Sequence, residues 1–178
     1  MSELRTNRIV PRDGLVSGTG IGGGIIQVKS TTKTDAFSDS STNFVDVTGL
    51  SVSITPTRSD SKILVLCSVN LNSNAENFAY LRLMRDSTAI FVGDASNNRA
   101  RVSAMYYVGG SSLNEGICET RSIIHMDAPS TTSATTYKIQ VQAFGGGSVH
   151  VNKTHRDSNE SGYDGRFASS ITAMEVSG

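Results

Sequence analysis

The segment SGTGIGGGIIQVKST, residues 17–31, joins a glycine-rich run to the first stretch of alternating apolar and polar residues. Gly18, Gly20 and Gly23 form the pattern G-x-G-x-x-G. In dinucleotide-binding proteins this pattern follows a strand, opens a helix, and precedes an acidic residue about twenty positions on. Here it follows the turn-like PRDG and leads directly into a strand pattern, so no helix N-terminus is available for a phosphate. We therefore expect a hinge and no bound cofactor.

From Ile25 onward, apolar and polar residues alternate in short segments, the period-two pattern of half-buried β-strands. Val, Ile, Thr and Tyr dominate these segments, and turn-forming Gly, Pro, Asn and Asp separate them. No segment keeps apolar residues at a helical period for three turns. The expected strands are residues 25–31, 44–47, 50–56, 62–71, 80–86, 89–94, 101–108, 117–126, 136–144, 148–152 and 169–176.

Short strands at near-regular spacing without helices between them predict an all-β, antiparallel β-sandwich, and about ten strands favour a jelly roll. Residues 62–71 (KILVLCSVNL) are nearly continuous in apolar side chains, so we expect a central strand covered on both faces. We assign residues 25–178 to this domain. Residues 1–24 have few large apolar side chains and many glycines, which predicts an extended N-terminal arm and hinge that cannot fold alone.

Composition excludes some kinds of partner. The 178 residues suffice for one domain with a core, and 16 basic side chains balance 16 acidic ones. A neutral chain gives no general reason to expect nucleic acid or an acidic membrane surface as a partner. No segment approaches the roughly 18 apolar residues of a membrane span, and no signal peptide is evident, so we expect a soluble product of a cytoplasm.

The sequence offers little catalytic chemistry. His150 and His155 are five residues apart, an odd separation that places them on opposite faces of an extended strand unless a turn intervenes. His125 has apolar neighbours and is interpreted as structural. Cys67 and Cys118 are expected to be small buried side chains, and their spacing does not indicate whether they pair. We find no Ser-His-Asp or paired-carboxylate arrangement and expect no enzyme.

One weak metal pattern is present. In DSNESGYDG, Asp157, Asn159 and Ser161 match the first half of a calcium-binding loop, in which alternate oxygens converge on one cation. The match fails at the twelfth position, where Ala168 replaces the bidentate Glu. We therefore expect a polar hairpin tip and assign no metal, with oxygen ligation as the lesser alternative.

Recognition is expected at tyrosines and loop tips. Tyr80, Tyr106, Tyr107 and Tyr163 each offer an apolar ring with a polar end, suited to saccharide or protein contact, although a core or interface position is the alternative. The richest loop tips are residues 70–78, 108–116 and 152–166. We favour the last as a receptor or glycan loop, against the alternative of a solvated hairpin. Its candidate contact residues are His155, Arg156, Tyr163 and Arg166.

The start of the chain, SELRTNRIVPRDG, resembles the N-terminal segment of many phage tail-fibre and other virion structural proteins, especially of marine and cyanobacterial viruses. These typically read (S)-x-L-x-(V/T)-(D/N)-x-I-x-(P/N)-x-x-G. Later segments also resemble the fibre-type domains of such viruses, whose layout is similar to the trimeric jelly rolls of tumour necrosis factor and complement globular heads. The residues assigned to the particle-attachment arm are Leu4, Asn7, Ile9, Val10, Pro11 and Gly14.

The resemblance implies a homotrimer in the virion, made in the host cytoplasm and attached to other capsid, tail or fibre proteins through the arm. It implies a short fibre or spike head that contributes to host attachment by contacting a surface glycan or protein. The alternative is a capsid or tail decoration (cement) protein without a receptor-binding role. The chain has almost no shaft, which favours a short head or decorating trimer in either case.

Overall fold

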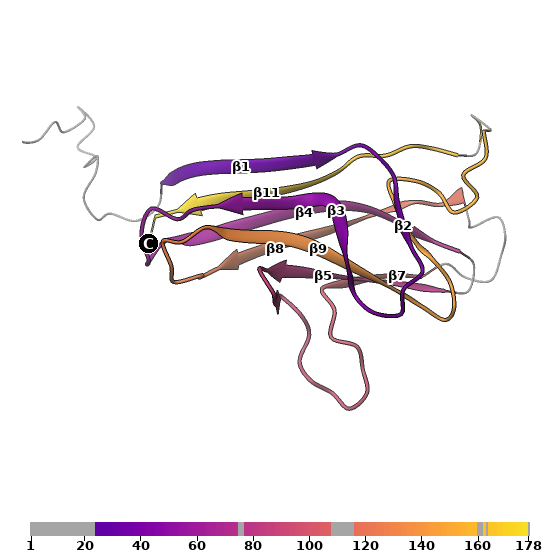
Figure 1. Ribbon diagram of the computed structural model, residues 1–178, viewed down its shortest axis with the longest axis horizontal. Coiled ribbons are helices and arrows are strands. Elements are labelled where there is room, and N and C mark those ends of the chain that lie inside the picture. Colours follow the sequence, from indigo (N-terminus) through magenta and orange to yellow (C-terminus); the bar gives the residue numbers. More distant parts are fainter. Residues whose placement is uncertain (1–23, 75–76, 108–115, 160–161, 163, 178) are drawn as a thin grey trace, which may run out of the picture.

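The computed structural model describes residues 24–74, 77–107, 116–159, 162 and 164–177, which form two antiparallel β-sheets (Figure 1). No α-helix occurs in these ranges, so the all-β prediction is confirmed. None of the described segments is a helix long and apolar enough to cross a membrane. The attachment-arm residues, Ser161 and Tyr163 lie outside the described residues.

Eleven strands are present in the described part of the chain. Residues 44–47 and 50–56, predicted as two strands, form one strand because a β-bulge near Gly49 (φ 80°) absorbs the irregular spacing. The predicted strand at 89–94 ends at Ile90, because Phe91 turns the chain with φ 51°. The strands are β1 (Ile25–Lys33), β2 (Phe37–Asp39), β3 (Val45–Ile54), β4 (Lys62–Ser73), β5 (Phe78–Arg85), β6 (Thr88–Ile90), β7 (Ala104–Tyr107), β8 (Glu119–Asp127), β9 (Thr135–Phe144), β10 (Val149–Val151) and β11 (Ser169–Val176).

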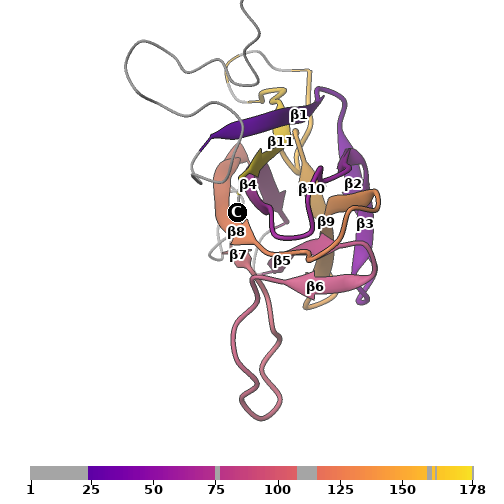
Figure 2. The same cartoon turned by 90° about the vertical axis from the view of Figure 1, so that its left-hand side faces the viewer.

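The first sheet, called the β4 sheet, has the order β1-β11-β4-β10-β2, with β8 paired to the other side of β4. The second, called the β5 sheet, has the order β3-β9-β5-β6, with β7 also paired to β5. The two sheets face one another and curl around a shared interior (Figure 2), an arrangement compatible with a β-sandwich. β4 is central in its sheet, as its apolar sequence predicts.

The core is built from the inward-facing residues of both sheets. Along β4 every second side chain is buried, and the same alternation continues in β5, β9 and β11. Burying one such aliphatic side chain contributes about 1.5–3 kcal/mol. The large side chains with the least exposure are Leu50, Ile54, Ile63, Leu71, Leu81, Leu83, Tyr106, Ile123, Tyr137, Ile139 and Ile171.

The outer side of β4 differs from expectation. Leu64, Leu66 and Ser68 are only partly buried, so one chain covers β4 on its inner face alone. The prediction of cover on both faces is wrong for a single chain, because each of two packed sheets leaves one face without a neighbouring layer. The apolar character of this outer face therefore needs another explanation.

Asp127, a buried carboxylate of the β4 sheet, has its partners on the β5 sheet. The Asp127 carboxylate on β8 accepts hydrogen bonds from Arg85 Nη1 on β5 (2.9 Å) and from the Tyr137 hydroxyl on β9 (2.7 Å), which links the two sheets. Burial and the hydrogen bond to Asp127 raise the pKa of Tyr137.

Cys67 and Cys118 are unpaired, and burial raises the pKa of each thiol to about 12, so both remain protonated near neutral pH.

Candidate functional site

The loop of residues 152–166, favoured from sequence as a contact loop, begins with a turn. β10 ends at Val151, and Asn152 has a positive φ of 62°. The Asn152 side chain holds this turn by donating to the carbonyl oxygens of Lys33 (2.8 Å) and Asp35 (3.1 Å). Asn tolerates this left-handed conformation better than most side chains do. The chain therefore folds back instead of continuing as a strand.

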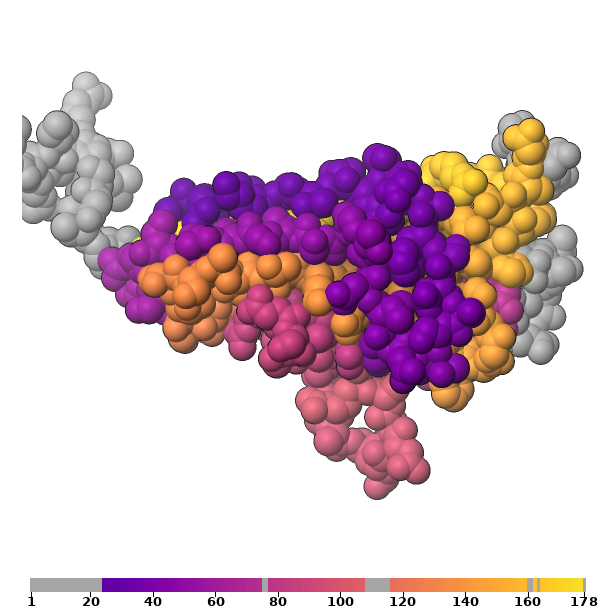
Figure 3. Space-filling view, viewed as in Figure 1, coloured from indigo at the N-terminus to yellow at the C-terminus, as the bar shows by residue number. Residues whose placement is uncertain are grey.

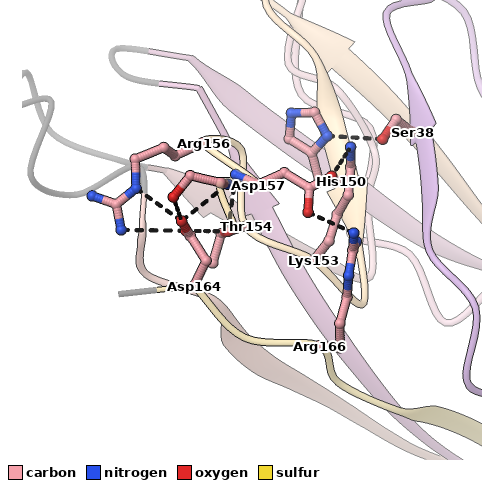
Figure 4. Close-up of polar contacts among 9 residues, drawn as sticks. Ser38, His150, Lys153, Thr154, Arg156, Asp157, Asp164 and Arg166 are labelled. Atoms are coloured by element: carbon pink, nitrogen blue, oxygen red, sulfur yellow. Dashed lines mark hydrogen bonds and ion pairs between the residues drawn. The ribbon is translucent and has the colours of Figure 1, made fainter. Parts of the chain in front are cut away.

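This turn brings His150 and His155 together. His150 Nε2 lies 2.9 Å from His155 Nδ1. On its other side, His150 Nδ1 lies 2.9 Å from Ser38 Oγ on β2 (Figure 4). The sequence analysis allowed for a turn between the two histidines, and the turn at Asn152 is the reason that they meet. Burial, with the charges of Lys153 and His155, lowers the pKa of His150 to about 4. The His150 ring is therefore neutral near pH 7.

Within the described residues, no group of three or more His, Cys, Asp or Glu side chains is placed to hold a metal ion. Asp157, the first residue of the calcium-loop pattern, instead pairs with Lys153 Nζ (3.2 Å) and Arg166 Nη2 (2.7 Å). Asn159 is exposed, and Ser161 lies outside the described residues. Two cations beside Asp157 oppose the oxygen-ligand reading of this pattern.

Asp164 is the centre of the loop, and the sequence analysis missed it. Its carboxylate accepts hydrogen bonds from Thr154 Oγ1 (2.6 Å), Arg156 Nε (3.0 Å) and the backbone N–H of Ser158 (3.0 Å) (Figure 4). The Ser158 hydroxyl also donates to it. Arg156, with Ser158 and Thr154, holds the pKa of Asp164 well below its usual range. An aspartate among turn residues gives no sequence signal for such a role, because its partners are set by the loop's path.

The four candidate contact residues of the loop differ in exposure and in their bonding partners. His155 is half-buried and bonded to His150, while Arg156 and Arg166 are exposed but engaged with Asp164 and Asp157. Tyr163 lies outside the described residues. The loop is thus cross-linked by its own ion pairs, which restrict the conformations of the two arginines.

A second feature is the outer face of the β4 sheet. The strand register places Val28, Met174, Leu64 and Met126 in one row across β1, β11, β4 and β8. The next row contains Ser30, Thr172, Leu66 and Ile124, and the row after it carries only hydroxyl side chains. We call the six apolar members of the first two rows the apolar face. Ile124 is 66% exposed, although it lies in the middle of a strand. A hollow of about 300 Å³ lies beside Leu66 and Ile124.

The tyrosines fall on both sides of the β5 sheet. Tyr106 points inward, is 2% exposed and donates a hydrogen bond from its hydroxyl to the carbonyl of Ile117. It occupies the core position that was the alternative, so the prediction of a surface contact is wrong for this residue. Tyr107 is exposed and Tyr80 partly exposed on the outer side. There they join Phe78 and Phe144, which the sequence analysis did not select. The ring centroids of Phe78 and Tyr107 are 4.5 Å apart, and those of Tyr80 and Phe144 are 5.8 Å apart. Period-two spacing in residues 78–80 and 105–107 signals one shared face but not that the two strands pair.

No protein-family model matches this chain, and the search of curated proteins found no match.

Proposed function

We propose that this chain is a virion structural protein, a short homotrimeric fibre or spike head that attaches to the particle through its N-terminal arm and contributes to host attachment. The observation that carries the proposal is the apolar face of the β4 sheet. Isolated proteins rarely leave a continuous apolar patch across four strands, and such patches mark interfaces. The occupant we propose is a second and third copy of the same chain.

The strand order supports this proposal. Read without the short strands β2, β6 and β10, the sheets have the orders β1-β11-β4-β8 and β3-β9-β5-β7. Two four-stranded antiparallel sheets connected in this way are the layout of a jelly roll. We propose this fold for the domain, in agreement with the resemblance to the trimeric heads of virion fibres.

The position of the start of β1 also supports it. The carbonyl of Gly24 accepts a hydrogen bond from the N–H of Ser177 (3.0 Å), so the start of β1 lies beside the end of β11. Val28 and Met174, in the first apolar row, lie near that same end. Closed rotational symmetry that covers the apolar face would therefore bring the starts of three domains close together. Three arms leaving from one end suit attachment to a particle.

A second candidate, a decoration protein without receptor binding, is favoured by one observation. Arg156 and Arg166, the cations of the predicted receptor loop, are paired with Asp164 and Asp157. A contact between this loop and a receptor would compete with those ion pairs. The two functions share the arm and the trimer and differ only in whether the exposed surface binds a host.

The experiment supplies wild-type or truncated protein to particles that lack the natural copy and measures its abundance in purified virions. Deletion of residues 1–23 is expected to leave thermal unfolding and the oligomeric state unchanged and to abolish incorporation. Incorporation of the truncated protein at normal copy number would contradict the arm. Particles without the protein are then tested for adsorption to host cells. Reduced adsorption supports host attachment, and unchanged adsorption favours decoration.

A further inference from the structure

The outer face of the β5 sheet carries aromatic side chains in register. Tyr80 on β5 lies opposite Met105 on β7 and opposite Gln142 on β9. The next row contains Tyr107, Phe78 and Phe144. Phe144 and Tyr107 are about half exposed, at 51% and 48%. The sheet thus presents rings from three strands to solvent on one surface.

The segment of residues 91–103, between β6 and β7, stands out from the body of the molecule (Figures 1 and 3). Its base is closed by hydrogen bonds from the N–H of Gly93 to the carbonyl of Val102 (3.4 Å) and from Arg101 Nε to the carbonyl of Gly93 (2.7 Å). Its tip is held by Arg99, whose Nη1 donates to Ser96 Oγ (2.8 Å). Hydrogen bonds within the segment therefore hold its conformation without a ligand.

The segment and the aromatic surface together enclose a pocket of about 370 Å³, within the range of small-molecule sites. Its lining combines two aromatic rings and three other apolar side chains with an amide or guanidinium at three positions. The lining residues are Tyr80, Met105, Phe144, Ala100, Val102, Asn98, Arg99 and Gln142.

We propose that this pocket binds one sugar residue of a saccharide. A pyranose ring has faces of C–H groups that pack on aromatic rings and a rim of hydroxyls that requires hydrogen-bond partners. Tyr80 and Phe144, with ring centroids 5.8 Å apart, offer the apolar surface. Asn98 and Arg99 offer donors, and Gln142 offers an amide whose Nε2 is already placed by donation to the carbonyl of Thr42. A purely apolar ligand would displace water from these polar groups without offering hydrogen bonds in return, at a cost in free energy.

Charge also favours a saccharide. Arg99 is the one charged side chain in the lining of this pocket, and the whole chain is neutral, so the pocket suits a neutral or singly charged sugar better than a polyanion. The pocket lies on the opposite sheet from the apolar face. It would stay accessible in an oligomer that buries that face. The inference rests on the proposed function in naming the ligand class for host attachment.

The experiment uses the full-length protein on an immobilised array of neutral and acidic oligosaccharides, and the strongest ligand is then titrated by calorimetry. Tyr80→Ala and Phe144→Ala are expected to weaken binding at least tenfold, and Gln142→Ala severalfold. Phe44→Ala is the matched control, because the Phe44 ring packs against Arg82 and does not line the pocket. Circular dichroism and light scattering of each variant exclude misfolding, and Phe144→Leu provides a milder change of the same surface.

Loss of binding in the pocket variants with retention in Phe44→Ala supports the site. Absence of saccharide binding by the wild type, or equal binding by all variants, would overturn it. Either failure leaves virion incorporation and adsorption to be judged separately, so the pocket and the proposed function can be rejected independently.

Discussion

His150 Nε2 and His155 Nδ1 lie 2.9 Å apart, with ring centroids separated by 5.0 Å, because the chain turns between the two residues. The inner ring, His150, is also bonded to Ser38 and is nearly inaccessible to solvent. A protonated imidazole in this place would lie close to Lys153 and to its own partner histidine. The arrangement therefore resists protonation of His150.

This resistance predicts acid sensitivity. The pKa of His150 falls from 6.5 to about 4 on folding, because burial and nearby positive charges disfavour the cation. Below pH 6.5 the unfolded chain binds a proton that the folded chain does not, so stability decreases as the pH falls toward 4. Between pH 7.5 and pH 4.5, the free energy of unfolding should therefore fall by about 2 kcal/mol less in His150→Gln than in the wild type. Urea unfolding at both pH values measures this difference.

Ser38→Ala is the control for that experiment, because it removes the hydroxyl partner and keeps the buried imidazole. It should retain the acid-dependent loss. If His150→Gln loses as much stability as the wild type over the same pH interval, His150 is not the group responsible.

The contacts of Glu175 predict a second loss of stability, at a lower pH than the loss caused by His150. Its buried carboxylate accepts hydrogen bonds from the Thr57 N–H (2.7 Å), Thr57 Oγ1 (2.7 Å) and Gln27 Nε2 (2.6 Å). Burial would raise its pKa, but these hydrogen bonds outweigh that effect and lower the pKa to about 2. Glu175→Gln replaces one accepting oxygen with a donor and should cost about 2–3 kcal/mol at pH 7.

The stabilisation from Glu175 is present above the unfolded pKa of 4.5 and is lost as the pH falls to about 2. The difference in unfolding free energy between wild type and Glu175→Gln should therefore shrink below pH 4. Glu119→Gln, which alters an exposed pair with Arg121, should change stability little at any pH. A constant difference between wild type and Glu175→Gln down to pH 2 would contradict this account.

Asp164→Asn should loosen the 152–166 loop without unfolding the domain. The amide cannot accept all the hydrogen bonds from Thr154, Arg156 and Ser158, and it removes the charge that pairs with Arg156. Trypsin cleavage after Arg156 or Arg166 should become several times faster, with little change in the global unfolding midpoint. Asp60→Asn breaks the exposed ion pair with Arg58 in another loop and should leave that cleavage rate unchanged. Equal cleavage of wild type and Asp164→Asn would show that the Asp164 contacts do not hold the loop.

The proposed trimer predicts the effect of a charge on the apolar face. Ile124→Glu should yield monomers at micromolar concentration, because three buried carboxylates would lie at the interface. Ile124 is exposed in one chain, so the variant should fold normally. Ser51→Glu places the same carboxylate on the outer side of the β5 sheet, opposite Lys138, and should remain trimeric. Light scattering measures the mass, and a monomeric wild type would overturn the trimer.

Local alternation determined much of the fold. In residues 62–71 successive side chains point alternately to the core and to the outside, as observed for Ile63 and Leu64. β2 was missed because its FSD sequence is too short to alternate. The bulge at Gly49 was missed because it spaces the buried side chains of Val47 and Leu50 three positions apart instead of two, which resembles a break between two strands.

The candidate sites depend on contacts between residues that the sequence alone does not bring together. Tyr80 and Phe144 share a surface only because β5 pairs with β9, and His150 meets His155 only because Asn152 reverses the chain. The period of two in the sequence thus determined the class of fold and which side chains face inward, since each strand sets its own alternation. Strand order and register, and with them every cross-strand cluster, were decided by the tertiary structure, because register depends on packing all the apolar faces into one core.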